Sequence, residues 1–247
     1  MAIVFGALGD IHGDFASVRR IVTAHPDVPF WLCVGDVADA EGRYEPFPAP
    51  VYWIKGNNEN FDLVDEAARK GRPHSLLDNL FYIPNGQLID IDVRPAVTGS
   101  LDVAPALTAG RTLRVAGLGG TFAPTMYETR AADLPHPKKG SAKATELADR
   151  RRHFVREEVD ACKRMRTIDV LLTHEAPRPF RVGRMDAGKT PINEVLAAMK
   201  PRLHLFGHHH RFAEADVSGV RSVSLDLIER SYLLVDSETL DFTVGLP

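Results

Sequence analysis

The sequence has 247 residues, of which 26% are charged and 44% are hydrophobic, and it carries a net charge of −3 at pH 7. This composition is that of an ordinary globular protein and excludes disordered, collagen-like and coiled-coil chains. The slightly acidic balance also argues against nucleic-acid binding through bulk charge.

Short apolar runs alternate with amphipathic stretches along the chain, a pattern that indicates α/β organisation. The predicted strands cover residues 2–8, 30–34, 51–54, 80–83, 87–91, 112–118, 168–172, 203–206, 211–217, 220–225, 232–235 and 240–244. The predicted helices cover residues 14–25, 60–70, 142–166 and 191–199. The stretch 142–166 has the clearest helical spacing of apolar residues.

Two irregular stretches, 94–110 and 121–141, interrupt this alternation. Loops of this length commonly serve as functional lids. We expect one domain over residues 1–247, with an irregular insert near 94–141. The sequence contains no apolar run of about 18 residues and no basic leader, so we expect no membrane association and a cytoplasmic location.

Residues of the kind that bind metals follow five of the predicted strands. The five groups are Asp10-Ile11-His12-Gly13, Gly35-Asp36, Gly56-Asn57-Asn58-Glu59, Thr173-His174-Glu175 and Gly207-His208-His209-His210. Since the strand ends of α/β sheets gather ligand sites, we expect these groups to converge on one rim.

The chemistry of these residues restricts the metal. Imidazole and carboxylate ligands without thiolate suit Mn, Fe, Zn or Ni, and they do not suit calcium or a closed structural zinc site. The ligands outnumber the needs of one ion. Two ions about 3.5–4 Å apart that share one carboxylate fit the number better.

The order Asp-x-His, Gly-Asp, Gly-Asn-Asn, His and Gly-His-x-His, which runs from Asp10 to His210, resembles the calcineurin-like metallophosphoesterase superfamily. The resemblance implies a four-layer α-β-β-α sandwich, in which two central mixed sheets are flanked by helices. It also implies two divalent metal ions. We expect Mn²⁺ as the first candidate, with Fe, Zn or Ni as alternatives.

The resemblance assigns a role to each motif residue. Asp10, His12 and His210 would hold one ion. Asn57, His174 and His208 would hold the other, and Asp36 would bridge the two. The function implied is hydrolysis of a phosphate ester, in the first place a phosphodiester, by a metal-bridging hydroxide that attacks phosphorus.

One position departs from the family pattern. The third motif of the family usually reads Gly-Asn-His-Asp/Glu, and its His is regarded as the general acid, whereas this chain has Asn58. An amide can bind a phosphoryl oxygen but cannot protonate an alkoxide, and general acid help is typically worth about 10²–10⁴-fold. We therefore expect diesters with good leaving groups as substrates, or another proton donor. His209, Glu59 and Glu175 are the candidates, and Asp36, Asn58 and His209 make up the expected catalytic set.

The same departure leaves a second function open, in which the chain is a metal-binding interaction or scaffold module of this fold with weak or no turnover. Scaffold proteins of the superfamily that lack the same His motivate this alternative.

Substrate contacts are expected from two regions. Arg178 and Arg181 follow His174 closely, and arginine binds phosphate oxygens bidentately. Residues 113–122 and the stretch Leu-Leu-Thr-His-Glu-Ala-Pro show a weaker similarity to RNA lariat debranching enzymes. That similarity implies that the insert shapes the substrate cleft through Tyr127 and Arg130. A nucleotide or RNA is thus among the candidate substrates, and the sequence does not predict the oligomeric state.

Overall fold

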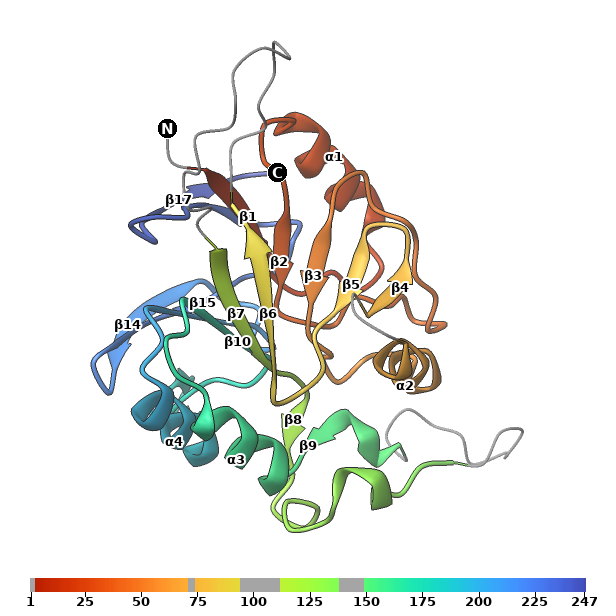
Figure 1. The fold of residues 1–247 in the computed structure, drawn as a ribbon, viewed down its shortest axis with the longest axis vertical. Coiled ribbons are helices and arrows are strands. Elements are labelled where there is room, and N and C mark those ends of the chain that lie inside the picture. Colours follow the sequence, from red (N-terminus) through yellow and green to blue (C-terminus); the bar gives the residue numbers. More distant parts are fainter. Residues whose placement is uncertain (1–2, 71–73, 94–111, 138–148) are drawn as a thin grey trace, which may run out of the picture.

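Two mixed β-sheets stack face to face in the computed structural model, which describes residues 3–70, 74–93, 112–137 and 149–247 (Figure 1). The first sheet has seven strands in the order β17-β16-β1-β2-β3-β5-β4. Their bounds are Val4–Leu8 (β1), Trp31–Cys33 (β2), Val51–Trp53 (β3), Ser75–Leu77 (β4), Leu80–Tyr82 (β5), Tyr232–Asp236 (β16) and Phe242–Gly245 (β17). Within it, β1, β2, β3 and β5 run parallel.

The second sheet has six strands in the order β14-β15-β13-β10-β7-β6. Their bounds are Gln87–Asp92 (β6), Thr112–Leu118 (β7), Val170–Thr173 (β10), Leu203–Phe206 (β13), Ala213–Val217 (β14) and Val220–Ser224 (β15). The strands β15, β13, β10 and β7 run parallel, and the two edge strands are antiparallel to their neighbours.

Three apolar layers hold these elements together. Side chains such as Leu32, Ile54 and Leu172 fill the space between the two sheets. On the outer face of the first sheet, α1 (Phe15–Ala24) and α2 (Phe61–Arg69) pack against a layer that includes both tryptophans. On the outer face of the second sheet lie α3 (Arg156–Arg164) and α4 (Thr190–Met199). The expected α-β-β-α sandwich is therefore confirmed.

The predicted helix over 142–166 is wrong over residues 149–155. Residues 142–148 lie outside the described residues, Arg150–Arg152 form a 3₁₀ turn, and β9 (His153–Phe154) pairs in parallel with β8 (Thr121–Phe122). The α-helix begins only after Val155, whose backbone N–H donates to the Glu158 carboxylate at 3.0 Å. Phe154 is fully buried and packs on Phe122, so tertiary packing overrides the helical spacing of this segment.

Several short elements were not predicted because, unlike the equally short β2, β3 and β5, they are not part of a longer apolar run. These are β4, β8, β9 and the hairpin of β11 (Arg181–Val182) and β12 (Met185–Asp186). Of the expected insert near 94–141, residues 94–111 and 138–141 lie outside the described part of the chain. The described remainder includes β8 and a 3₁₀ turn at Ala131–Asp133. No helix among the described residues is long and apolar enough to cross a membrane.

His204 on β13 provides a test of the buried polar core. Its Nδ1 and Nε2 atoms lie 3.1 Å from Ser222 Oγ and 2.8 Å from Thr173 Oγ1, and burial lowers the pKa of the imidazole to about 3. Below the ordinary histidine pKa, His204 binds a proton in the unfolded chain but not in the native state. The free energy of unfolding therefore decreases as the pH falls from about 6.5 towards 3. Between pH 7 and pH 5, we expect the wild type to lose about 2 kcal/mol more unfolding free energy than His204→Gln. Urea unfolding at the two pH values measures this difference, and equal losses would contradict the assignment.

Candidate metal centre

The five predicted ligand groups meet at one edge of the stacked sheets. Asp10, Asp36 and Asn57 follow the carboxyl ends of the parallel strands β1, β2 and β3. His174 and His208 follow the carboxyl ends of the parallel strands β10 and β13 in the facing sheet. The convergence expected from the sequence is thus present, because parallel strands end at the same side of a sheet.

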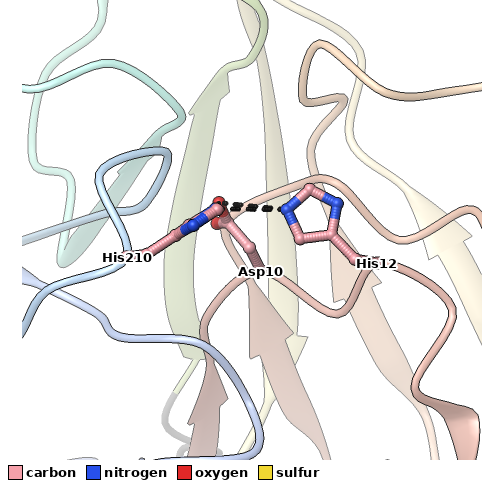
Figure 2. A group of neighbouring side chains, drawn as sticks. All are labelled: Asp10, His12 and His210. Atoms are coloured by element: carbon pink, nitrogen blue, oxygen red, sulfur yellow. Dashed lines mark hydrogen bonds and ion pairs between the residues drawn. The ribbon is translucent and has the colours of Figure 1, made fainter.

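One group of side chains consists of Asp10, His12 and His210 (Figure 2). One donor atom of each lies within 4.8 Å of the others. The His210 Nε2 atom is 3.1 Å from Asp10 Oδ2 and 3.1 Å from His12 Nε2. Asp10 is buried, whereas both imidazoles reach the surface, so this side of the site is open to solvent.

The second group consists of Asp36, His174 and His208, and it lies deeper. His174 is fully buried, and its Nε2 atom lies 3.0 Å from the Asn57 side-chain oxygen. Asp36 lies between the two groups, because its Oδ2 atom is 3.6 Å from His12 Nε2 and also 3.6 Å from His174 Nε2.

The backbone at the site is unusual in a way that the sequence does not reveal. His12, Asp36, His208 and His210 all have positive φ angles, between 47° and 71°, in a region that L residues adopt at a cost. Two glycines allow close approach to the carboxylates. A Cβ on Gly56 would come within 1.9 Å of Asp36 Oδ1, and one on Gly207 within 2.3 Å of Asp10 Oδ1. Strain of this kind concentrates at functional sites.

The donor set around His174 fits a cation. Its Nδ1 atom lies 2.9 Å from the Val34 carbonyl oxygen, which requires a proton on Nδ1 and leaves the lone pair of the neutral ring on Nε2. When the ring is neutral, that lone pair faces the oxygens of Asn57 and Asp36, so three acceptors converge on one place. Burial alone would lower the pKa of His174, but the carboxylates of Asp36 and Asp10 raise it, which shows that this place favours positive charge.

The pKa values of Asp36 and His208 are also shifted by their surroundings. Burial of Asp36 alone would raise its pKa, but the facing imidazole of His174 and the Asn58 backbone N–H lower it. Burial, with His174 and His209 nearby, lowers the pKa of His208 to about 3, so this ring is neutral and able to bind a metal ion at pH 7.

Asn58 contacts Asp36 directly. Its side-chain Nδ2 donates to Asp36 Oδ2 at 2.9 Å, and its backbone N–H donates to Asp36 Oδ1 at 2.8 Å. Beneath it, the buried Glu59 carboxylate accepts hydrogen bonds from Val37 N, Gly56 N and the Tyr44 hydroxyl, which tie the β2 and β3 loops together. The Glu59 carboxylate is therefore buried and held by these donors.

The His209 ring lies against the ring of the ligand His208, with centroids 4.9 Å apart. The His209 ring also stacks on Phe180 with centroids 4.9 Å apart, and its Nε2 atom lies 3.9 Å from Glu175 Oε2. Neither of these two atoms has a hydrogen-bond partner among the described residues. Burial and the nearby Lys189 lower the pKa of His209 to about 4.

The expected substrate residues fall into two groups. Arg178 and Arg181 are exposed beside the loop that follows β10, and the Arg178 guanidinium binds Asp186 at 2.9 Å. Arg130 is also exposed, on the β8 side of the molecule. Tyr127 is buried against Phe122, under the Arg156 guanidinium, so its ring packs in the core beneath α3.

The chain is similar to one known protein family and to several solved structures. Residues 3–212 match the family model described as calcineurin-like phosphoesterase. Among solved structures, the chain is similar to TT1561 of Thermus thermophilus, with a TM-score of 0.60 and 15% identity over 100% of this chain and 99% of that one. It also matches GAP50, the anchor in the inner membrane complex of Plasmodium, with a TM-score of 0.49 and 10% identity over 99% of this chain and 88% of that one.

At 15% identity the match to TT1561 indicates the fold alone. No curated protein matches the sequence significantly. The weaker similarity to RNA lariat debranching enzymes is not shown by the comparisons.

Proposed function

The chain belongs to the calcineurin-like phosphoesterase family, and on that premise we propose that it is a phosphodiesterase that works with two divalent metal ions. The observation that carries the proposal is the position of Asp36 Oδ2, 3.6 Å from one imidazole of each ligand group. A single carboxylate oxygen between two sets of ligands is the arrangement that a bridged pair of ions requires.

The donor groups divide between the ions as the motifs suggest. Asp10, His12 and His210 would hold one ion, and Asn57, His174 and His208 the other, with Asp36 shared. Manganese is the first candidate, and iron, zinc and nickel suit the same ligands. When bound, the ions supply an activated water and neutralise charge on the phosphoryl oxygens.

The chain's own residues account for the preference for a diester with a good leaving group. Asn58 holds Asp36 through two hydrogen bonds and has no proton to give to an alkoxide. The pKa of His209 is lowered to about 4, so its imidazole is neutral at pH 7 and would have to gain a proton before it could act as an alternative donor. Its use would also require the ring to turn from Phe180, against which it stacks. Arg178 and Arg181 are candidates to bind the non-leaving part of the substrate.

A comparison of two aryl esters tests the proposal. With Mn²⁺ we expect the purified protein to hydrolyse bis(p-nitrophenyl) phosphate at least about tenfold faster than p-nitrophenyl phosphate, and a chelator should abolish both activities. Release of p-nitrophenol measures the rates.

The scaffold alternative rests on Asn58, since a chain without a general acid could keep its metals and lose turnover. It would be favoured if the protein bound two ions per chain yet hydrolysed neither ester with Mn, Fe, Ni or Zn. A faster reaction on the monoester would instead contradict the diesterase assignment and leave the metal centre intact.

A further inference from the structure

The candidate ligand His208 lies at the centre of a tight turn of the main chain. The His209 N–H donates to the Gly207 carbonyl oxygen at 2.9 Å, which closes a three-residue turn around His208. The φ angle of His208 is 71°, and a turn of this kind with a positive φ at its centre is the rare and strained form. Such strain persists only where the surrounding contacts hold the backbone in place. The contacts of His208 and His209 therefore determine how firmly this ligand is presented.

The His208 ring forms no hydrogen bond with the described residues. Metal-binding imidazoles usually donate their second N–H to a carbonyl or carboxylate oxygen, as His174 does to the Val34 carbonyl at 2.9 Å. The main-chain N–H of His208 donates to the Asp10 carboxylate, but its ring contacts two other rings instead. The ring centroids lie 4.8 Å from that of His174 and 4.9 Å from that of His209. Packing between rings therefore takes the place of the usual hydrogen bond.

His209 connects the His208 ring to a buried apolar cluster. The His209 ring stacks on Phe180 with centroids 4.9 Å apart and planes inclined by 29°. Phe180 in turn packs edge-on against Phe206, with centroids 5.3 Å apart, and both phenylalanines are more than nine-tenths buried. The side chain of His209 therefore attaches the strained turn to a part of the core.

A buried carboxylate lies against the same imidazole. The Glu175 Oε2 atom is 3.9 Å from His209 Nε2, and Glu175 Oε1 accepts a hydrogen bond from the Phe122 N–H at 3.0 Å. Glu175 and Phe180 both belong to the loop that follows β10, and Glu175 directly follows the ligand His174. Through these two contacts, His209 joins the loop that carries His208 to the loop that carries His174.

The exposure of His209 differs from that of the open ligands. Its side chain is 12% exposed, compared with 32% for His12 and 40% for His210. Its Nε2 atom is buried on the side of Glu175. The sequence suggested a catalytic role for His209, but these contacts are those of a residue that supports a ligand.

We infer that His209 is a positioning residue, which holds the strained turn at His208 by stacking on Phe180. It thereby fixes the direction of the His208 ring relative to Asn57 and His174, the other proposed ligands of the same ion. Since the contact is one of packing, an aromatic ring at position 209 is sufficient and the ring nitrogens are not required. The inference rests on the proposed function in that it assumes an ion at His208, but it does not depend on turnover.

Metal affinity provides the test. Calorimetric titration of Mn²⁺ into the chelator-treated full chain should give two ions per chain for the wild type. We expect His209→Ala to bind one of the ions about 10-fold more weakly and His209→Phe to stay within about threefold of the wild type. His208→Gln, which removes the ligand itself, identifies the affected ion. His136→Ala is the matched control, because His136 is exposed, and it should leave both affinities unchanged.

Phe180→Leu tests the same contact from its other side. It keeps an apolar side chain but removes the stacked ring, so it should weaken the same ion about as much as His209→Ala does. In the double variant the loss should not exceed that of either single variant by more than about twofold, because one shared contact can be lost only once. The visible absorption of the Co²⁺-loaded protein reports ligand geometry directly. Its bands should change in His209→Ala and return in His209→Phe, which a loss of overall stability alone would not produce.

The outcomes separate this inference from the proposed function. Wild-type affinity for both ions in His209→Ala and Phe180→Leu would overturn the inference. A folded His209→Phe that binds as weakly as His209→Ala, or additive losses in the double variant, would overturn it too. A wild type that binds two ions but hydrolyses neither ester would contradict the proposed function alone, and one that binds no ion would contradict both. Thermal unfolding identifies a variant that fails to fold, in which case the substitution at the other residue decides.

Discussion

Asp36→Asn is expected to lower kcat/KM for bis(p-nitrophenyl) phosphate by about 10³-fold, the largest loss of any single substitution at the metal centre. Asp36 is the group closest to both sets of imidazoles, and it is almost completely buried among them. An amide of the same shape keeps one oxygen but removes the negative charge that two neighbouring cations need. We therefore expect the metal content to fall from two ions per chain to one or none, as measured by mass spectrometry of the dialysed protein.

Asp39→Asn is the matched control for this change. Asp39 lies three residues further along the same connection, where its carboxylate accepts hydrogen bonds from Glu41 N, Arg43 N and Arg43 Nε. Its loss should leave both the metal content and kcat/KM within about threefold of the wild type. If Asp36→Asn kept two ions and most of its activity, the bridged centre would be excluded.

The sequence predicted the meeting of the candidate ligands better than the structure around them, for a physical reason. Ligands must stand directly after strands that end at one edge, so Asp10, Asp36 and His174 could be recognised from local patterns. The strands Thr112–Leu118 and Leu203–Phe206 were predicted to the residue, because their mostly buried, apolar sequences differ clearly from the turns around them. In α1 and α2 the predicted starts fell on Asp14 and Asn60, which cap those helices.

The features that could not be predicted from the sequence depend on contacts between distant segments. The extended conformation of His153 and Phe154 comes from pairing with β8, about thirty residues earlier, and no local signal competes with the helical spacing around it. The role of the Val34 carbonyl in orienting His174 involves a main-chain atom that every residue has. The positive φ angles of His12, Asp36, His208 and His210 are likewise imposed by the folded site, since none of these residue types requires them.

Asn58→His is the second large effect that we expect, and it is a gain. An imidazole at this position can protonate a leaving alkoxide, which is typically worth about 10²–10⁴-fold for poor leaving groups and little for p-nitrophenol. The backbone N–H of residue 58 would still bind Asp36 Oδ1, whereas the side-chain bond to Oδ2 would be lost. We expect turnover of a diester with a primary alcohol as leaving group to rise about 10²-fold relative to its p-nitrophenyl counterpart.

Asn58→Ala distinguishes the two roles of the side chain. It removes the same hydrogen bond to Asp36 without adding a proton donor, so it should lower the rates for both leaving groups by a similar factor. A rate–pH profile of Asn58→His should also acquire a limb that falls as the imidazole loses its proton, which Asn58→Ala lacks. If Asn58→His changed both esters equally, the leaving group would not be limited by a missing acid. Another proton donor would then already act in the wild type.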